Sequence, residues 1–364
     1  MKHPNPRSML LAMAAAVGLA VAVGTSPTDA NAQQAPFAGK TVTLLHNTPP
    51  GSSVDVFARQ VGPYLVKHLP GAPQFIVVAK PGGRFLLGAT HLHANVAPDG
   101  QTIGMLATLP GQLATRVKLS WDLSDFVYTG GLGQTYVFYA RKDLGIPSAA
   151  QLRAGKNPII LGGAAPNTNS NLIWRLFMQA VGMQDKYKQI YGLQGQMGQL
   201  KSMRSNDSNM GSMLGTLFLQ MRGGLDKEGM FVTLFETGHM DEAGNMHPTP
   251  QLGVPTIDSL WRSWAPQTVD SKEYRAFKVL LTTMQLTWVF ALPPKTPQEF
   301  AKHWEQAFAK ALEDPGFVAD MQKADTLVPE FVGSAATLRG IAAIRQAASD
   351  PQYEAAIEPH FLKR

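Results

Sequence analysis

The sequence contains no cysteine, and this absence excludes several kinds of protein. A chain without cysteine has no disulfide framework, no thiolate ligand for a metal and no N-terminal cysteine that could carry a lipid. The sequence also lacks the G-x-S-x-G, H-E-x-x-H and G-x-x-x-x-G-K patterns of nucleophile elbows, zinc peptidases and P-loops. No base–nucleophile pair can be named from the residues alone, so we predict no catalytic residues.

Concentrated charge of one sign is missing as well. The chain has 32 Lys and Arg against 26 Asp and Glu, and its formal net charge is +6. The basic residues are scattered and are not interleaved with aromatic residues, so we expect no nucleic-acid partner. A mildly basic surface would instead attract small anions over a distance.

The one long apolar run lies at the N-terminus. Lys2 and Arg7 precede the apolar run Met9–Val23, and Ala30-Asn31-Ala32 follows it. This order predicts a cleavable signal peptide at residues 1–32, because the run is short for a membrane span. Export without disulfides fits the periplasm of a bacterium. About 330 residues remain, more than one compact core usually reaches, so we expect two lobes.

The stretch TVTLLHNTPPGSSVDVFAR, residues 41–59, organises the first half of the chain. Its β-branched start predicts a buried strand, the Pro-Pro-Gly-Ser-Ser run ends that strand, and apolar residues then recur at helical spacing. We expect the helix to start near Ser52 or Ser53, with Ser53 as the N-cap and Asp55 in the first turn. Such a loop can bind an anion, and an ordinary strand–helix turn is the alternative.

The following residues continue this pattern. Phe75–Ala79 and Thr102–Ala107 predict two more strands, with a helix at Leu86–Asn95 between them. A β-α-β-α-β order with short connections is typical of a mostly parallel sheet. Ligands bind beyond the carboxyl ends of such strands, which places three segments on one rim. These segments are Asn47–Asp55, Lys80–Arg84 and Thr108–Pro110.

A second unit of the same kind lies further along the chain. Pro158–Leu161 predicts a strand, Gly162–Ser170 a loop of small and polar residues, and Leu172–Val181 a helix. Two such loops in different halves could face each other across a cleft and hold both ends of a polar ligand.

A metal site is not expected. His91 and His93 form an H-x-H pair, but residues two apart do not share a helix face. A closed metal site needs three or four convergent ligands, and no nearby Asp or Glu completes the set. We therefore expect neither a metal nor a cofactor.

Five segments together resemble a known family. They read PPGSSVDVFAR, KPGGRFLLGATHL, NVAPDGQTIG, GVPTIDSLW and LPPKTPQEFAKHWEQAFAKALEDPGF. In this order they are similar to the tripartite tricarboxylate transporter substrate-binding proteins, the Bug or TctC-like family. The similarity extends from about Lys40 to about Ala348.

The resemblance implies an α/β fold of the periplasmic binding protein type II class, a two-lobed Venus flytrap with a mostly parallel sheet in each lobe. Lobe one would contain residues 33–137 and 290–364, and lobe two residues 138–289. Two crossing strands, near Tyr136–Ala140 and Trp288–Leu292, would join the lobes. The implied partners are a small organic acid and integral membrane subunits of a tripartite tricarboxylate transporter. We expect a monomer.

The resemblance also implies which residues bind the ligand in the cleft between the lobes. Most ligands of the family are small carboxylates, held largely by backbone N–H groups and water. Carried over by position, the binding residues are Thr48, Gly51, Ser52, Ser53, Asp55, Thr108, Ala164, Asn167, Thr168, Asn169, Ser170 and Asn209.

The chain departs from the family pattern at two places. Gly51-Ser52 stands where relatives have two glycines, and Gly195–Met210 replaces a stretch that usually contains an acidic residue. The second change would suit an aromatic or amide-bearing ligand as well as a dicarboxylate. Two alternatives remain open, an exported two-lobed enzyme acting on an ester or carboxylate, and a receptor that feeds a signalling partner.

Overall fold

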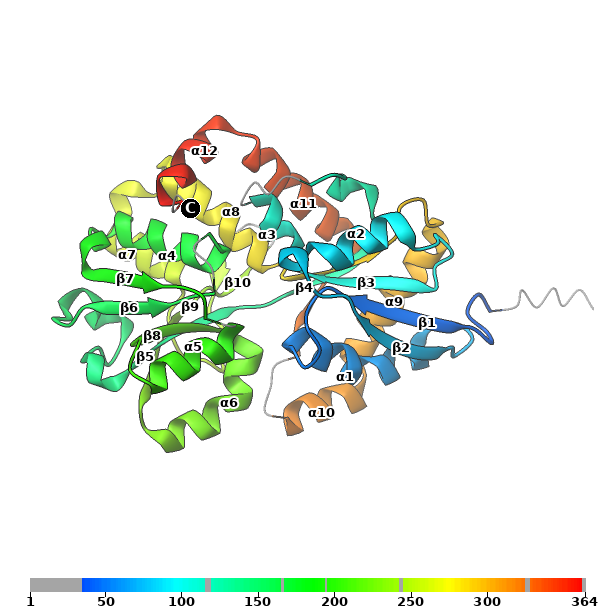
Figure 1. Cartoon of the computed structure of the whole chain (residues 1–364), viewed down its shortest axis with the longest axis horizontal. Helices are drawn as coiled ribbons and strands as arrows, with labels where there is room; N and C mark the ends of the chain where they lie inside the picture. Colours follow the sequence, from blue (N-terminus) through cyan, green and yellow to red (C-terminus); the bar gives the residue numbers. More distant parts are fainter. Residues whose placement is uncertain are drawn as a thin grey trace, which may run out of the picture.

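Two α/β lobes lie side by side in the computed structural model, and each is built on a mixed β-sheet flanked by helices (Figure 1). The structure describes residues 35–114, 119–164, 167–193, 195–241, 245–324 and 328–361, without the side chains of Arg84 and Leu113. The predicted signal peptide therefore lies outside the described residues. We call the lobe of the six-stranded sheet the first lobe, and the lobe of the five-stranded sheet the second lobe.

The first-lobe sheet has the strand order β13-β4-β12-β3-β1-β2. Its strands are β1 (Thr41–His46), β2 (Gln74–Ala79), β3 (Thr102–Ala107), β4 (Val127–Gly133), β12 (Trp288–Leu292) and β13 (Glu330–Gly333). β1 pairs in parallel with both β2 and β3, as the β-α-β-α-β pattern predicts. β12 is antiparallel to β3 and β4, and β13 is antiparallel to β4. Four strands thus run one way and two the other.

The second-lobe sheet has the order β7-β6-β8-β5-β9. Its strands are β5 (Tyr136–Arg141), β6 (Ile159–Gly162), β7 (Tyr187–Ile190), β8 (Met210–Leu214) and β9 (Phe231–Glu236). β6 is parallel to β7 and β8, whereas β5 is antiparallel to β8 and β9. A short ribbon of β10 (His239–Met240) and β11 (Met246–His247) follows β9.

Two short segments beside the cleft connect the lobes, and the chain crosses a third time, back to the second lobe, after β13, where residues 351–360 pack on α8 and α4. The first is Gln134–Thr135, between β4 and β5, and the second lies between α8 and β12. The Gln134 N–H donates to the Met284 carbonyl at 3.1 Å and joins the two segments. The predicted crossing strands, Tyr136–Ala140 and Trp288–Leu292, each belong to one sheet, so the crossings are the connections next to them.

Twelve helices cover the two sheets in the described part of the chain. They are α1 (Ser53–His68), α2 (Leu86–Asn95), α3 (Leu109–Ala114), α4 (Asn169–Ala180), α5 (Gly195–Arg204), α6 (Gly215–Glu228), α7 (Ile257–Trp264), α8 (Lys272–Met284), α9 (Gln298–Glu313), α10 (Pro315–Lys323), α11 (Ser334–Ala348) and α12 (Pro351–Ile357). No helix among the described residues has the length and apolarity that a membrane span requires.

Helix packing fixes how the lobes sit. In the first lobe α1 packs against α9, because Phe57, Val61 and Leu65 on α1 and Trp304 and Phe308 on α9 are buried in one core. α8 contacts α4 of the second lobe on one side and α3 and α11 on the other, and these helices form the layer at the top of Figure 1. The loops after β1, β3, β6 and β8 therefore meet between the lobes, at the carboxyl ends of their strands.

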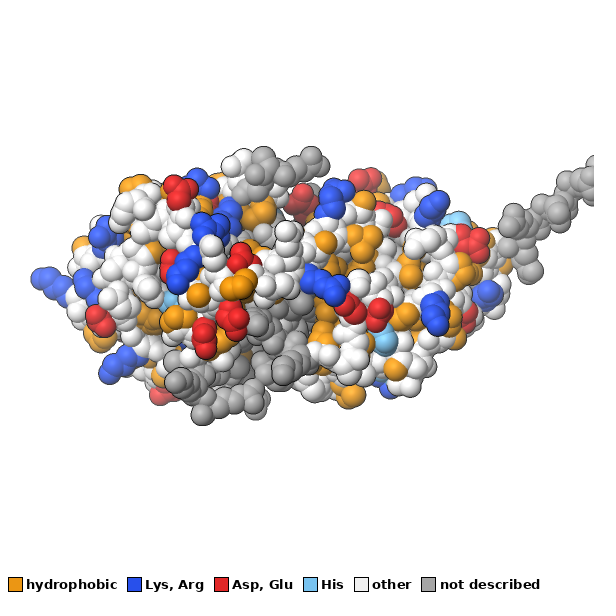
Figure 2. All heavy atoms as spheres, turned by 90° about the horizontal axis from the view of Figure 1, so that it is seen from above, with side chains coloured by type: hydrophobic (Ala, Val, Ile, Leu, Met, Phe, Trp, Pro, Cys, Tyr) orange, Lys and Arg blue, Asp and Glu red, His pale blue; other side chains and the backbone are white. Residues whose placement is uncertain are grey.

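The face of the molecule seen in Figure 2 carries mixed charge. On the face shown in Figure 2, Lys and Arg side chains alternate with Asp and Glu without a large field of one sign. Single hydrophobic side chains lie between them, which is normal for a globular surface.

Candidate functional site: the cleft between the lobes

Two adjoining compartments form one cleft between the lobes. The larger has a volume of about 710 Å³ and contains the loop that precedes α1. The smaller has a volume of about 360 Å³ and contains the loop that precedes α4. Both are lined by Phe85, Thr108, Tyr136, Gln196 and Thr287, so the compartments are continuous.

The α1 side of the cleft is a capped helix N-terminus. Ser52, not Ser53, is the N-cap: its backbone is extended, with φ −69° and ψ 164°, and its Oγ accepts the Asp55 N–H at 3.3 Å. The prediction was wrong by one residue, because both serines suit a cap and only the backbone geometry separates them. Among the described residues, the N–H groups of Ser53 and Val54 have no partner, as expected for the first turn of a helix.

Asp55 stabilises this loop from the side that faces away from the cleft. Its carboxylate accepts the Gly51 N–H at 2.9 Å, and it pairs with Arg59 and with the buried His46 at 2.9 Å each. The hydrogen bond from the Arg59 guanidinium, followed by that from Gly51, lowers the pKa of Asp55 to about 2. Asp55 is therefore ionised at neutral pH, and its carboxylate faces Arg59 and His46 rather than the cleft.

A hydrogen-bonded chain leads from Asp55 to the cleft wall. His46 Nε2 meets Asp55 Oδ1, His46 Nδ1 lies 3.0 Å from Thr48 Oγ1, and Thr48 Oγ1 lies 2.7 Å from Ser52 Oγ. Burial lowers the pKa of His46, which keeps the imidazole neutral at pH 7. With Nε2–H donating to the carboxylate, Nδ1 can accept the Thr48 proton. In a catalytic triad the same arrangement would make Asp55 the orienting acid, His46 the base and Thr48 the nucleophile.

The α4 side of the cleft is a second helix N-terminus of a different kind. Thr168 is the N-cap, but its side chain accepts no capping hydrogen bond from a backbone N–H of the helix and instead contacts the Ser170 hydroxyl at 3.4 Å, and the first turn contains no acidic residue. Asn169 Nδ2 donates to Thr283 Oγ1 at 2.6 Å and ties the start of α4 to α8. α5 begins at Gly195 beside the same compartment, also without an acidic residue in its first turn.

The floor of the cleft contains polar groups without partners. Thr108 lines both compartments with a left-handed backbone, φ 61°, and its buried Oγ1 has no hydrogen-bond partner among the described residues. Gln134 is 3% exposed; its Oε1 accepts from Thr216, and its buried Nε2 has no described partner. Burial raises the pKa of Tyr136 to about 12, so this phenol stays neutral.

The described lining of the cleft contains no Lys, Arg, His, Asp or Glu. The side chain of Arg84, on the predicted rim, lies outside the description. A charged ligand would therefore interact with backbone N–H groups, helix dipoles, hydroxyls and side-chain amides.

Ten of the twelve predicted ligand-binding residues line this cleft. The larger compartment contains Thr48, Gly51, Ser52 and Ser53, the smaller contains Ala164, Asn167, Thr168, Asn169 and Ser170, and Thr108 lines both. The tertiary structure brings these residues together from three loops.

Asp55 and Asn209, the other two predicted residues, do not line the cleft. Asp55 points into the hydrogen-bond network behind the α1 loop. Asn209 precedes β8, at the opposite end of that strand from the cleft, and holds the backbone of β6 through Ile160 N at 2.7 Å and Pro158 O at 2.9 Å.

Sequence reasoning missed several lining residues. Phe85, Gln134, Tyr136, Thr287 and Trp288 line the cleft although no loop motif marks them. Gln134 and Thr287 belong to the crossings between the lobes, and Phe85 reaches the cleft through a left-handed backbone, φ 73°. The altered stretch did contain a usable signal, since Gly195, Gln196, Met197 and Gln199 all line the cleft.

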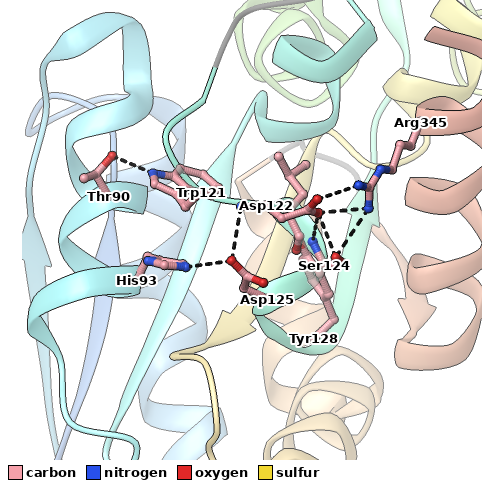
Figure 3. Close-up of polar contacts among 9 residues, drawn as sticks. Thr90, His93, Trp121, Asp122, Ser124, Asp125, Tyr128 and Arg345 are labelled. Atoms are coloured by element: carbon pink, nitrogen blue, oxygen red, sulfur yellow. Dashed lines mark hydrogen bonds and ion pairs between the residues drawn. The ribbon is translucent and has the colours of Figure 1, made fainter. Parts of the chain in front are cut away.

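The H-x-H pair serves no metal among the described residues. His93 Nε2 lies 3.0 Å from Asp125 Oδ2, and its ring stacks on Trp121 (Figure 3). Trp121 donates to Thr90 at 3.0 Å, and Arg345 pairs with Asp122 at the start of the same turn. The described residues contain no group of three His, Cys, Asp or Glu placed to hold a metal ion. This cluster joins α2 to α11 and is structural.

Comparison with known proteins identifies the fold. No protein-family model matches the chain, and no curated protein matches its sequence. A TctC solute-binding protein from Polaromonas is 17% identical, with a TM-score of 0.58 over 84% of this chain and 97% of that one. The periplasmic binding protein BugD is 16% identical, with a TM-score of 0.60 over 88% and 97%. MatC from Rhodopseudomonas palustris, solved with bound malate, is 16% identical, with a TM-score of 0.57 over 87% and 99%.

These likenesses confirm the predicted fold class, the two-lobed fold of the periplasmic binding protein type II class. The matched structures include a TctC protein and a Bug protein, and these belong to the group that the sequence motifs resemble. At these identities they establish the fold and not the ligand.

Proposed function

We propose that this protein is an extracytoplasmic solute receptor that binds a small organic acid in the cleft between its lobes. One observation carries the proposal: the N-termini of α1 and α4, one from each lobe, open onto one continuous cleft. Helix N-termini offer free N–H groups and a positive partial charge, which stabilise an anion without a cationic side chain.

A role in solute uptake from the periplasm is suggested by the fold and by the predicted signal peptide. The matched structures include proteins named as periplasmic and solute-binding, and the predicted signal peptide would direct this chain to the periplasm. We propose that the monomeric receptor closes over its ligand and delivers it to membrane subunits of the tripartite tricarboxylate type. We place the hinge of this closure at the two short crossings beside the cleft.

A ligand screen tests the receptor function. Native mass spectrometry of the mature protein as purified, followed by thermal shift against mono- and dicarboxylates, aromatic acids and amides, should reveal one class that stabilises the protein. The stabilisation should reach about 2.7 kcal/mol at a hundredfold excess of ligand over its Kd. The ligand should be recovered unchanged at one molecule per chain. No bound mass and no shift with any acid would contradict the proposal.

A second candidate function, hydrolysis of an ester, is favoured by the Asp55–His46–Thr48 chain of hydrogen bonds. Thr48 Oγ1 would attack the carbonyl, His46 would take its proton, and the free N–H groups of Ser53 and Val54 would stabilise the oxyanion. His46 would then give the proton to the leaving alcohol as the ester C–O bond breaks, and a water molecule would release the acid from Thr48 by the same steps. We prefer the receptor because His46 is fully buried and Thr48 is only 5% exposed.

Turnover separates the two functions. An esterase should hydrolyse p-nitrophenyl acetate, and His46→Asn should abolish that hydrolysis while ligand binding in the screen persists. A receptor should hydrolyse the ester no faster than His46→Asn does.

A further inference from the structure

The two compartments of the cleft are lined by different kinds of residue, and this difference concerns the class of ligand. Most residues of the smaller compartment carry an amide or a hydroxyl, among them Asn167, Ser170, Gln199 and Ser212. The larger compartment is polar only along the α1 loop and a few glutamines. The rest of its wall consists largely of apolar residues, among them Val54, Phe57, Leu214, Leu217, Trp288 and Met321.

The mouth of the larger compartment is also apolar. Val56 is 41% exposed, Phe85 39% and Met197 50%, and all three line the cleft. Val56 and Phe85 belong to the first lobe and Met197 to the second. Exposed apolar side chains that converge from two lobes mark a surface that a ligand or lobe closure covers.

The two helix N-termini differ in electrostatics as well. At α1, the ionised Asp55 already takes the Gly51 N–H and stands in the first turn, where it compensates the positive end of the dipole. The Ser52 and Asp55 N–H groups are bound within the loop. The starts of α4 and α5 have no acidic residue in the first turn. An added anion is therefore favoured in the smaller compartment.

Gln199 provides an independent sign of a ligand in the smaller compartment. It is 7% exposed, and its Oε1 accepts the Ser212 N–H at 3.1 Å, which orients the side-chain amide. Its Nε2 then has no partner among the described residues. Since Gln199 lines the smaller compartment, this Nε2 can donate to a ligand oxygen there.

We infer that the cleft selects an amphipathic monocarboxylic acid, with its carboxylate in the smaller compartment near Gln199 and the start of α4. Its apolar, preferably aromatic, body would lie against Leu217, Trp288 and Met321 in the larger compartment. The inference rests on the proposed receptor function and narrows it. A short dicarboxylate would have to place its second charge beside the apolar wall, where desolvation opposes it, or at the start of α1, whose positive dipole end Asp55 already compensates.

Isothermal titration of the full mature protein, freed of bound ligand, tests this inference. 3-Phenylpropanoate should bind at least about tenfold more tightly than adipate, which has a similar length but two charges. It should also bind at least about tenfold more tightly than neutral 3-phenylpropanamide, because the carboxylate is recognised. Tighter binding of adipate, or equal binding of the amide, would overturn the inference while the receptor function stands. Binding of no acid at all would overturn the receptor function itself.

A reciprocal pair of variants locates the carboxylate. Gln199→Glu keeps an oxygen for the Ser212 N–H but adds a negative charge to the smaller compartment. Gln60→Glu adds the same charge to the larger compartment, from the half-buried Gln60 of α1. Gln199→Glu should weaken 3-phenylpropanoate binding at least about tenfold more than Gln60→Glu does. The reverse order would place the carboxylate at α1 and would contradict the inference.

Discussion

Thr108 shows most directly how the cleft shapes a single residue. Its φ of 61° lies in the left-handed region, which is costly for a β-branched residue. The hydrogen bond from its N–H to the Thr287 carbonyl, 2.9 Å, holds the backbone against the second crossing. Its hydroxyl remains buried without a described partner at the junction of the two compartments. Strain and an unpaired donor at one position are typical of a binding site.

Substitution of Thr108 should separate stability from binding. Thr108→Gly should be more stable than Thr108→Ala by about 1 kcal/mol, because glycine adopts a positive φ without steric cost. Both variants should lose ligand affinity by about threefold or more, because both lack the hydroxyl. Urea unfolding and calorimetry measure the two quantities. Unchanged ligand affinity in both variants would show that the Thr108 hydroxyl does not contact the ligand.

At the scale of elements, the helices α1 and α4 perform similar roles through different local chemistry. α1 is closed by Ser52, which accepts the Asp55 N–H and also contacts Thr48. α4 has no side-chain cap, and its first turn is left for other partners. A capped and acid-compensated helix favours stability, whereas an uncapped one facing a cleft favours a ligand.

The position of the α1 cap is testable by paired substitutions. Ser52→Ala should lower the free energy of unfolding by about 1 kcal/mol, because the Asp55 N–H loses its acceptor. Ser53→Ala should change it by less than about 0.5 kcal/mol, because the first helical position needs no acceptor. Urea denaturation of both variants gives the comparison. A larger loss for Ser53→Ala would return the cap to Ser53.

At the scale of the whole molecule, a buried carboxylate sits beside the first crossing. Glu236 is fully buried, and its oxygens accept from Thr135 at 2.7 Å, from the Thr249 N–H at 2.6 Å and from the Thr249 hydroxyl at 2.7 Å. Thr135 is part of the crossing, and His239 contacts Thr249 at 3.0 Å. Burial is the largest influence and raises the pKa of Glu236. Folding therefore favours the protonated form of this group.

This raised pKa predicts how stability depends on pH. Above the ordinary glutamate pKa of 4.5 the unfolded chain loses the proton first, so the contribution of Glu236 to stability falls as pH rises through its folded pKa. The free energy of unfolding of the wild type should accordingly fall relative to that of Glu236→Gln as pH rises from about 4.5 towards 7. Urea unfolding of both proteins across this range measures it. A wild type that gains stability relative to Glu236→Gln as pH rises would mean that the three hydrogen bonds outweigh burial.

The sequence by itself was sufficient to predict the local units of this protein. β1 with α1 and β6 with α4 are apparent from apolar periodicity, turn residues and helix-start signals, all of which lie within a few neighbours. β4 was not predicted, since three glycines in VYTGGLG interrupt its pattern and its pairing partners, β12 and β13, come more than 150 residues later. Two lobes were expected from the length of the chain, and the order of the sequence motifs, through the family resemblance, predicted the type II fold.

Only the tertiary structure decided what the cleft contains. It turned Asp55 towards His46, placed Asn209 at the far end of β8, and brought Gln134, Thr216 and Thr287 together from both lobes. Local sequence encodes which backbone a segment adopts, because the relevant interactions are between near neighbours. Which side chains share a cavity depends on long-range packing of the two lobes, and the crossings at Gln134–Thr135 and before β12 set that packing.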